Sequence, residues 1–332
     1  MKRALFVTFT AVLGLVACKQ SAPPPEPTKQ PAAETVQVKE PAPVPATGSA
    51  APGSAAVAAD PWKKEAPKKD PLARPLFWSI EKDGITSYAL GTIHVGVDAE
   101  ARLPAVVWAK IDAAKTFAME TDLTDPALQK ILTCTRCSLK KDLGPKHWAK
   151  LEEVLGADVA ARIETMKPMV AATMMSLQGL PTTTQMDTLL LARAQNGGKQ
   201  IVYLEQASHE AALLEKWMNV KALRAMLDDV EGGAKHTKEM LDAYLAGDEA
   251  RMVKLADVEK AQALAHGYTA SEYEESMQDM LYGRNAAWIA PLEKLHAAGG
   301  GFIAVGAMHL VGPKNVLELL AAKGYKVTRV TP

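Results

Sequence analysis

The chain has little of several features that mark common classes of protein. Only 5% of its 332 residues are aromatic, which argues against a large flat cofactor, and it has three cysteines. Its 38 basic residues equal its 38 acidic residues in number, and no basic patch stands out, so we expect no nucleic-acid partner. His209-Glu210 has no second histidine at the spacing of the helical zinc-protease motif, so that motif is absent.

The first 18 residues have the features of a bacterial lipoprotein signal. Two basic residues precede an apolar segment, residues 4–16, which is too short to span a bilayer comfortably. Residues 15–18 read Leu-Val-Ala-Cys and match a lipobox, so we expect cleavage before Cys18 and lipidation of this cysteine. An ordinary secretory signal with an incidental cysteine is the alternative. Because Lys19 rather than aspartate follows, we expect an outer-membrane lipoprotein that faces the periplasm.

Residues 19–75 are rich in Pro, Ala, Lys and Glu and contain almost no large apolar side chains. Ordering such a segment would cost conformational entropy without burying apolar surface. Its prolines favour an extended chain of about 3 Å per residue where it is polyproline-like. We therefore interpret residues 19–75 as a disordered tether. Residues 76–332 are long enough to form one sizeable α/β domain.

Two of the three cysteines, Cys134 and Cys137, are separated by two residues. This spacing occurs in redox-active sites and in half-sites for zinc, but no second cysteine pair is present and no thioredoxin-like strand precedes it. In the periplasm, a local disulfide that closes a small loop is the simplest interpretation.

The domain alternates short apolar runs with long stretches rich in Leu and Met. Strands are expected at residues 76–80, 85–90, 116–120, 199–205, 302–305 and 325–330. Helices are expected at residues 104–114, 126–195, 208–297 and 313–323, with breaks near Gly232-Gly233 and Gly247-Asp248. Asp83-Gly84 between the first two strands predicts a hairpin. The pattern predicts an α/β (α+β) fold, with a mixed split β-sheet flanked by helices and a large helical insert.

Two matching motifs stand at opposite ends of this domain. Each is an apolar run followed by Gly-x-x-His, and the motifs end at His94 and His309. Glycine at a strand end lets the backbone turn or approach another group closely. Open α/β sheets usually carry their sites at such strand ends. We therefore expect one site built from both ends of the domain.

Glu120 and Glu205 also follow expected strands, so four polar side chains stand at strand ends. A set of His94, Glu120 and His309 with a vacant position fits a hydrolytic metal centre, in which the ion lowers the pKa of a bound water. These ligand types do not choose among Mn, Co and Zn. The alternative is that each histidine only satisfies local hydrogen bonds at its strand end.

Arg284-Asn285 lies in the last long expected helix. The arginine could hold a substrate carboxylate or stabilise an oxyanion. Spacing alone favours a plainer account, in which Arg284 lies on the helix surface and pairs with a nearby acid. The remaining histidines show no paired ligands in the sequence, and they are His147, His209, His236, His266 and His296.

A series of segments follows a fixed order along the domain: Gly91-Thr92-Ile93-His94, Ala118-Met-Glu120-Thr-Asp122, Lys167-Pro168, Met186-Asp187, residues 199–205, Arg284-Asn285, residues 302–312 and Gly324-Tyr325-Lys-Val327. This series resembles the TraB/GumN family over nearly all of residues 76–330. That family resembles the animal Tiki proteases, which are membrane-tethered and metal-dependent, and more distantly the erythromycin esterase and ChaN-like folds. The resemblance implies a cleft formed by His94, Glu120, Arg284 and His309. It makes Asn285 and Glu205 secondary candidates.

Three functions are consistent with these observations. The leading hypothesis is a lipid-anchored periplasmic metal-dependent hydrolase, with His94, Glu120 and His309 at the metal and Arg284 and Asn285 beside it. We expect its substrate to be a peptide or protein, and its contact with the membrane to be through the lipid alone. The second is a non-catalytic protein that binds haem or a metal in the same cleft. The third is a scaffold for an envelope complex.

Overall fold

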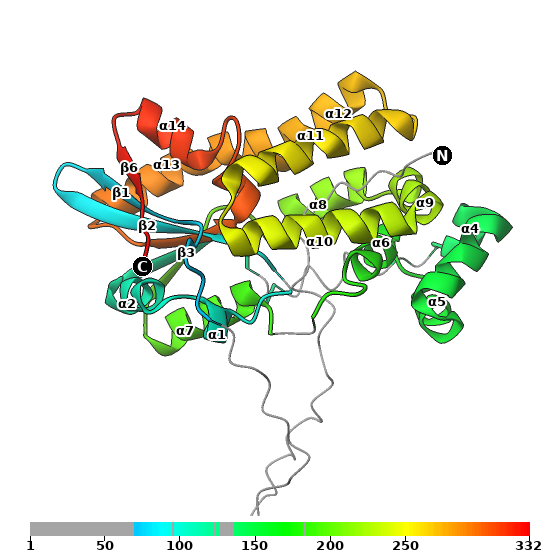
Figure 1. The fold of residues 1–332 in the computed structure, drawn as a ribbon, viewed down its shortest axis with the longest axis horizontal. Coiled ribbons are helices and arrows are strands. Elements are labelled where there is room, and N and C mark those ends of the chain that lie inside the picture. Colours follow the sequence, from blue (N-terminus) through cyan, green and yellow to red (C-terminus); the bar gives the residue numbers. More distant parts are fainter. Residues whose placement is uncertain (1–69, 95, 123, 126–133, 135, 182–183) are drawn as a thin grey trace, which may run out of the picture. The chain divides into compact units, whose positions relative to one another are not determined.

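The computed structural model describes residues 70–332 except 95, 123, 126–133, 135 and 182–183 (Figure 1). The expected signal, the lipobox residue Cys18 and nearly all of the expected tether lie outside the described residues. No helix in the described part of the chain is both long and apolar enough to cross a membrane.

The described residues contain a six-stranded mixed sheet in the order β4-β3-β5-β2-β1-β6. Its strands are β1 (Phe77–Lys82), β2 (Ile85–Thr92), β3 (Thr116–Met119), β4 (Gln200–Tyr203), β5 (Phe302–Gly306) and β6 (Lys326–Arg329). β4, β3, β5 and β2 run parallel to one another. β1 runs antiparallel to β2 on one side and to β6 on the other. The predicted fold class, a mixed sheet with helices, is confirmed.

The hairpin between β1 and β2 forms where the sequence predicts it. Lys82 pairs with Ile85, which leaves Asp83 and Gly84 as the two turn residues. Their φ angles are 51° and 76°, and a two-residue turn with positive φ at both positions matches the right-handed twist of the flanking strands. Aspartate and glycine tolerate this conformation better than other residues.

The two ends of the domain meet in the middle of the sheet. β5 lies between β2 and β3, with Tyr88 opposite Phe302 and Thr92 opposite Gly306. Both strands are buried over most of their length, because helices cover the two faces of the sheet. Neighbouring strands therefore end together, and the residues that follow them lie at one edge.

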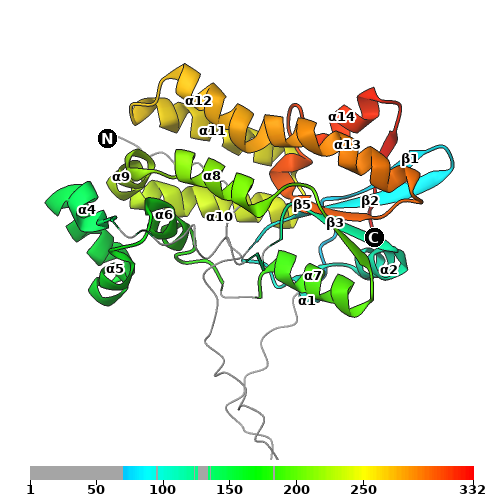
Figure 2. The same cartoon turned by 180° about the vertical axis from the view of Figure 1, so that it is seen from behind.

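Helices form a layer on each face of the sheet (Figures 1 and 2). One layer contains α1 (Ala99–Arg102), α2 (Ala105–Ala113) and α7 (Met186–Asn196). The other contains α13 (Gly283–Ala297) and α14 (Val316–Ala322), whereas α10 (Val230–Ala246) and α11 (Glu249–Ala265) extend from the sheet toward the remaining helices. Two short helical turns, η1 (Gln278–Tyr282) and η2 (Ala307–His309), adjoin α13 and β5.

The helical insert has a hydrophobic core of its own. Its helices are α4 (Leu139–Leu155), α5 (Ala157–Ile163), α6 (Pro168–Ser176), α8 (Ala207–Trp217) and α9 (Val220–Asp228), and α12 (Ala270–Met277) leads into η1. Leu139, Leu151, Ala171 and Leu223 are fully buried in this second cluster, apart from the core beneath the sheet. Cys134 and Cys137 are joined by a disulfide just before α4.

One predicted helix break is wrong. Gly232-Gly233 lies inside α10, and the break falls earlier, at Asp229. The Asp229 carboxylate accepts a hydrogen bond of 3.0 Å from the Gly232 amide and so caps α10. The cap decides where the helix begins, and the glycines are tolerated in its first turn. The predicted break at Gly247-Asp248 is confirmed, because Gly247 ends α10 with a left-handed φ of 62°.

Candidate active site

The glycines of both Gly-x-x-His motifs permit close approaches at the sheet edge. A Cβ on Gly91 would lie 3.1 Å from the Cα of Ala307 and 3.1 Å from the Cβ of Leu76. A Cβ on Gly306 would lie 3.2 Å from Oε1 of Glu120. The Gly306 amide donates to that oxygen at 2.6 Å. Each glycine therefore brings its strand end against the next part of the site.

His94 follows β2 and is anchored through one ring nitrogen. Its Nδ1 lies 2.5 Å from Oδ2 of Asp187, in the first turn of α7, and Thr92 Oγ1 donates to Oδ1 of the same carboxylate at 2.7 Å. The ring is buried, and its other nitrogen, Nε2, has no hydrogen-bond partner in the structure. A buried polar atom without a partner is uncommon, and in the described part of the chain Arg102, Thr121 and Trp288 carry others.

The charge on His94 is set by these neighbours. Burial alone would lower the pKa of the imidazole, but the Asp187 charge and hydrogen bond outweigh it, with smaller contributions from Glu120 and Glu210. Together they raise the pKa of His94 to about 9. The protein therefore holds a His94 imidazolium at neutral pH, paired with the Asp187 carboxylate.

His309 lies in η2, directly after β5, and is anchored in the same way. Its Nδ1 is 2.6 Å from Oδ1 of Asn285, whose amide nitrogen donates to the carbonyl of Lys314 at 3.0 Å. That second bond orients the Asn285 oxygen toward the ring, so Nδ1 carries the proton and Nε2 is an acceptor. Burial lowers the pKa of His309 to about 3, since the nearby Arg284 charge offsets that of Glu120. The ring is neutral at pH 7.

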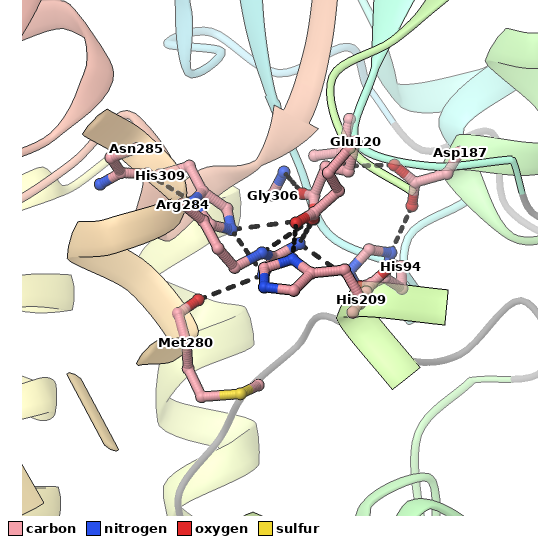
Figure 3. A network of polar contacts seen from close by, with 12 residues as sticks. His94, Glu120, Asp187, His209, Met280, Arg284, Asn285, Gly306 and His309 are labelled. Carbon is pink, nitrogen blue, oxygen red and sulfur yellow. Dashed lines mark hydrogen bonds and ion pairs between the residues drawn. The ribbon is translucent and has the colours of Figure 1, made fainter. Parts of the chain in front are cut away.

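Arg284 is the centre of the charge network (Figure 3). Its guanidinium donates to Oε2 of Glu120 at 2.7 Å and to Oε1 of Glu205 at 2.8 Å, and it lies 3.5 Å from Oε1 of Glu210. It also lies 3.3 Å from Nε2 of His309. The surface position that spacing favours is wrong, because Arg284 is only 2% exposed and α13 directs it toward the strand ends.

A local irregularity directs Arg284 into the site. The π-helical turn η1 precedes α13, and Arg284 donates to the carbonyl of Met280 within it at 3.1 Å. A Cβ on Gly283 would lie 2.7 Å from the backbone oxygen of Gln278, so this turn requires glycine there. Single π-turns are frequent at functional sites because they re-aim the side chains that follow them.

The carboxylates around Arg284 differ in protonation. Burial raises the pKa of Glu120, but the positive groups around it and the Gly306 amide outweigh burial and lower it to about 2. For Glu210, burial and the charges of Glu120 and Glu205 outweigh the attraction of Arg284 and raise the pKa to about 8. At pH 7 the site therefore holds an ionised Glu120 beside a protonated Glu210.

Three glutamates offer oxygens for a cation. Oxygen atoms of Glu120, Glu205 and Glu210 lie within 4.8 Å of one another, close enough to hold one metal ion. Glu210 is a site residue that sequence reasoning missed, although it stands five residues after Glu205 at the start of α8. The guanidinium of Arg284 partly neutralises these carboxylates.

His209 corrects the expectation that the remaining histidines are unconnected with the site. Its Nδ1 lies 3.2 Å from Oε2 of Glu205, and its side chain is 58% exposed, whereas His94 and His309 are buried. His236 and His296 form their own pairs elsewhere, with Glu259 and Ser87.

The structure thus brings the predicted residues Glu120, Glu205, Arg284, Asn285 and His309 into one hydrogen-bonded network. His94 is drawn beside this network with Asp187, and the charges of Glu120 and Glu210 influence its pKa (Figure 3). Asp187 is the other residue whose role sequence reasoning missed. Asp187 stands 93 positions from His94 in the sequence. It could have been identified only by inferring that the Met186-Asp187 segment lies beside the Gly-x-x-His motif that ends at His94.

Two comparisons with known proteins found a match and a third found none. The chain is 25% identical to the uncharacterized protein YbaP of Shigella flexneri over 251 residues, which cover 70% of this chain and 87% of the relative. No solved structure matches the chain significantly. The family model described as the TraB/PrgY/gumN family matches residues 76–329, which include every strand and both Gly-x-x-His motifs. The chain therefore belongs to the TraB/PrgY/gumN family.

Proposed function

We propose that this protein is a metal-dependent hydrolase that cleaves peptide bonds. The observation that carries the proposal is the state of His94. Its ring is held rigidly through Nδ1, yet Nε2 is buried and lacks a partner. Leaving such an atom unsatisfied costs free energy, which a ligand at Nε2 would recover.

The donor types of this site are those that bind divalent metal ions, although the group of described residues close enough to share one ion is Glu120, Glu205 and Glu210, without His94 or His309. His94 and His309 each use Nδ1 to contact a neighbouring oxygen, from Asp187 and Asn285. Nε2 of His94 has no partner, whereas Nε2 of His309 lies 3.3 Å from Arg284 and 3.7 Å from Oε2 of Glu120. Metal-binding histidines are oriented in this way by the residues behind them. We propose that His94, Glu120 and His309 hold the ion. This mixture of nitrogen and oxygen ligands suits Mn, Co or Zn alike.

When bound, such an ion supplies a Lewis acid and a water of lowered pKa. The remaining steps depend on the protein's own groups. Oε1 of Glu120 accepts from the Gly306 amide and Oε2 accepts from Arg284, so the carboxylate is held in one orientation, and a remaining lone pair on Oε2 could accept a proton from an attacking water. Arg284 presents a fixed cation that can stabilise negative charge on the substrate oxygen. Asn285 keeps the His309 proton on Nδ1.

A peptide-cleavage screen with added divalent metals tests the reaction. The parent protein is compared with His94→Ala and His309→Ala. His147→Ala is the control, since His147 contacts Asp228 away from the site. We expect metal-dependent turnover in the parent and the control, and a loss of at least about 100-fold in the two site variants. Equal turnover in all four proteins would reject the mechanism.

A second candidate function is metal capture without catalysis. The close approach of the Glu120, Glu205 and Glu210 oxygens favours it, because three carboxylates can retain an ion whether or not a substrate enters. Metal analysis of the purified protein separates the two functions. A tightly held stoichiometric ion with no turnover of any peptide would favour capture.

The proposed location is the periplasmic face of the outer membrane, with Cys18 as the lipid anchor. The lipobox pattern of residues 15–18 supports this proposal. We expect the parent protein to partition with membranes and the Cys18→Ala variant to remain in the aqueous fraction. Membrane partitioning of the variant would contradict lipid anchoring.

A further inference from the structure

The two edge strands of the sheet differ in how well they could pair with the backbone of another chain. β6 carries Lys326 and Arg329, and charged residues on an edge strand discourage pairing with another strand. β4, at the other edge, reads Gln-Ile-Val-Tyr and contains neither charge nor proline. Residues of these types favour the extended conformation. The β4 edge is therefore suited to strand pairing and the β6 edge is not.

Within the part of the chain that the structure describes, no strand pairs with the outer side of β4. Among the described strands, β4 pairs with β3 alone. The amides of Gln200 and Leu204 donate toward β3, to the carbonyls of Lys115 and Met119, at 3.0 and 2.9 Å. Because successive residues of a strand alternate in direction, the N–H and C=O groups of Ile201 and Tyr203 point to the open edge. Both residues are half-buried, whereas most of β3 is buried.

This edge leads directly to the candidate active site. Glu205 stands two residues beyond the end of β4, and its amide donates to the carbonyl of Glu120 at 2.9 Å. Two residues of extended chain span about 7 Å. A chain paired with Ile201 and Tyr203 would therefore pass Glu205, which contacts Arg284, within two or three residues of the paired segment.

We propose that the open edge of β4 binds an extended peptide by strand addition and so carries a peptide bond into the site. This inference rests on the proposed peptidase function for the cleavage step, whereas the binding step stands on the edge itself. Backbone hydrogen bonds supply such affinity with little dependence on sequence. Only two residues of β4 face outward, which is too little contact for a stable pair of protein copies and adequate for a transient substrate.

The test uses a dye-labelled pool of decapeptides of mixed sequence. Amide hydrogen exchange of the parent, with and without the pool, reports directly on the edge. We expect the Ile201 and Tyr203 amides to exchange more slowly when peptide is present. Fluorescence polarisation then compares the parent with Ile201→Pro, which removes one outward N–H without removing a bond to β3. We expect binding about fivefold to tenfold weaker.

Val327→Pro is the matched control, because it alters an outward amide of β6 on the opposite edge. Val330 donates to the carbonyl of Phe77 at 2.8 Å, and the alternation along β6 turns the Val327 amide away from β1. Circular dichroism and thermal melting establish that both proline variants fold. Exchange data on the parent keep the test decisive if either does not.

Each result decides the matter. Unchanged exchange of both amides, or equal affinity of the parent and Ile201→Pro, overturns strand addition. Slow exchange without peptide, together with dimers in size-exclusion chromatography, also overturns it, because a second copy then occupies the edge. Protection by peptide without metal-dependent cleavage supports the binding edge and refutes the hydrolase. Metal-dependent cleavage without protection does the reverse.

Discussion

The pairing of His94 with Asp187 predicts a stability change that depends on pH. The perturbation is Asp187→Asn in metal-free protein. Asparagine can still accept the hydrogen bond from Thr92, but it supplies no negative charge to the imidazolium. The carboxylate is what raises the pKa of His94 against the effect of burial. Its removal should therefore lower the pKa of this buried ring below its usual value.

The magnitude follows from the two pKa values of His94. The folded value is about 9, and the unfolded value is about 6.5. This difference corresponds to about 3 kcal/mol of folding free energy. Since the folded pKa is the higher one, the stabilisation is complete below about pH 6.5 and is lost as the pH rises through about 9. Asp187→Asn should thus cost about 3 kcal/mol near pH 6 and much less near pH 10.

The assay is urea denaturation in the presence of EDTA, followed by tryptophan fluorescence at both pH values. Asp228→Asn is the control, because Asp228 contacts Lys146 and His147 at the surface. It should cost less than about 1 kcal/mol at either pH. An equal cost of Asp187→Asn at both pH values, or a larger cost near pH 10, would refute the charge assigned to His94.

Three further predictions concern the surroundings of the site and the insert. Arg284→Met leaves buried glutamates without their cation and should lower the free energy of unfolding by about 3–5 kcal/mol in urea denaturation. The control Arg193→Met breaks an exposed pair with Asp112 and should lower it by less than about 1 kcal/mol. Equal costs of the two substitutions would contradict this prediction. Gly283→Ala brings a Cβ against the Gln278 carbonyl and should cost about 1–3 kcal/mol in the same assay, and an unchanged midpoint would show that the π-turn relaxes freely. Periplasmic protein purified without reductant should show no free thiol at Cys134 and Cys137, and a thiol assay that finds two would count against their disulfide.

The sheet was predictable because its signals are local. Each strand is a short apolar run bounded by glycine or polar residues, and the Asp83-Gly84 turn specifies its hairpin. The placement of His94 and His309 at one edge of the sheet also followed from local signals, since each comes directly after one of two parallel neighbouring strands. The glycine of each Gly-x-x-His motif was predictable as a point of close backbone approach, and a Cβ at either position would crowd the neighbouring part of the site.

The rest of the site depends on packing that sequence periodicity does not record. The π-turn before α13 determines where Arg284 points, and no residue pattern marked that turn in advance. Asp187 reaches His94 only because α7 begins beside the end of β2, after a long helical insert. Glu210 becomes a site residue because the first turn of α8 returns it toward Arg284. Each of these depends on how distant elements dock.

Metal titration of the apo-protein tests the central claim most directly. Isothermal calorimetry with Zn, Co and Mn salts should show one ion per chain for the parent and for the His147→Ala control. The same titrations with His94→Ala and His309→Ala should show affinity reduced by at least about 100-fold, because each variant removes one of three ligands. Unchanged metal affinity in both variants, or no binding of any of these ions by the parent, would contradict the assignment of His94, Glu120 and His309 as a shared metal site.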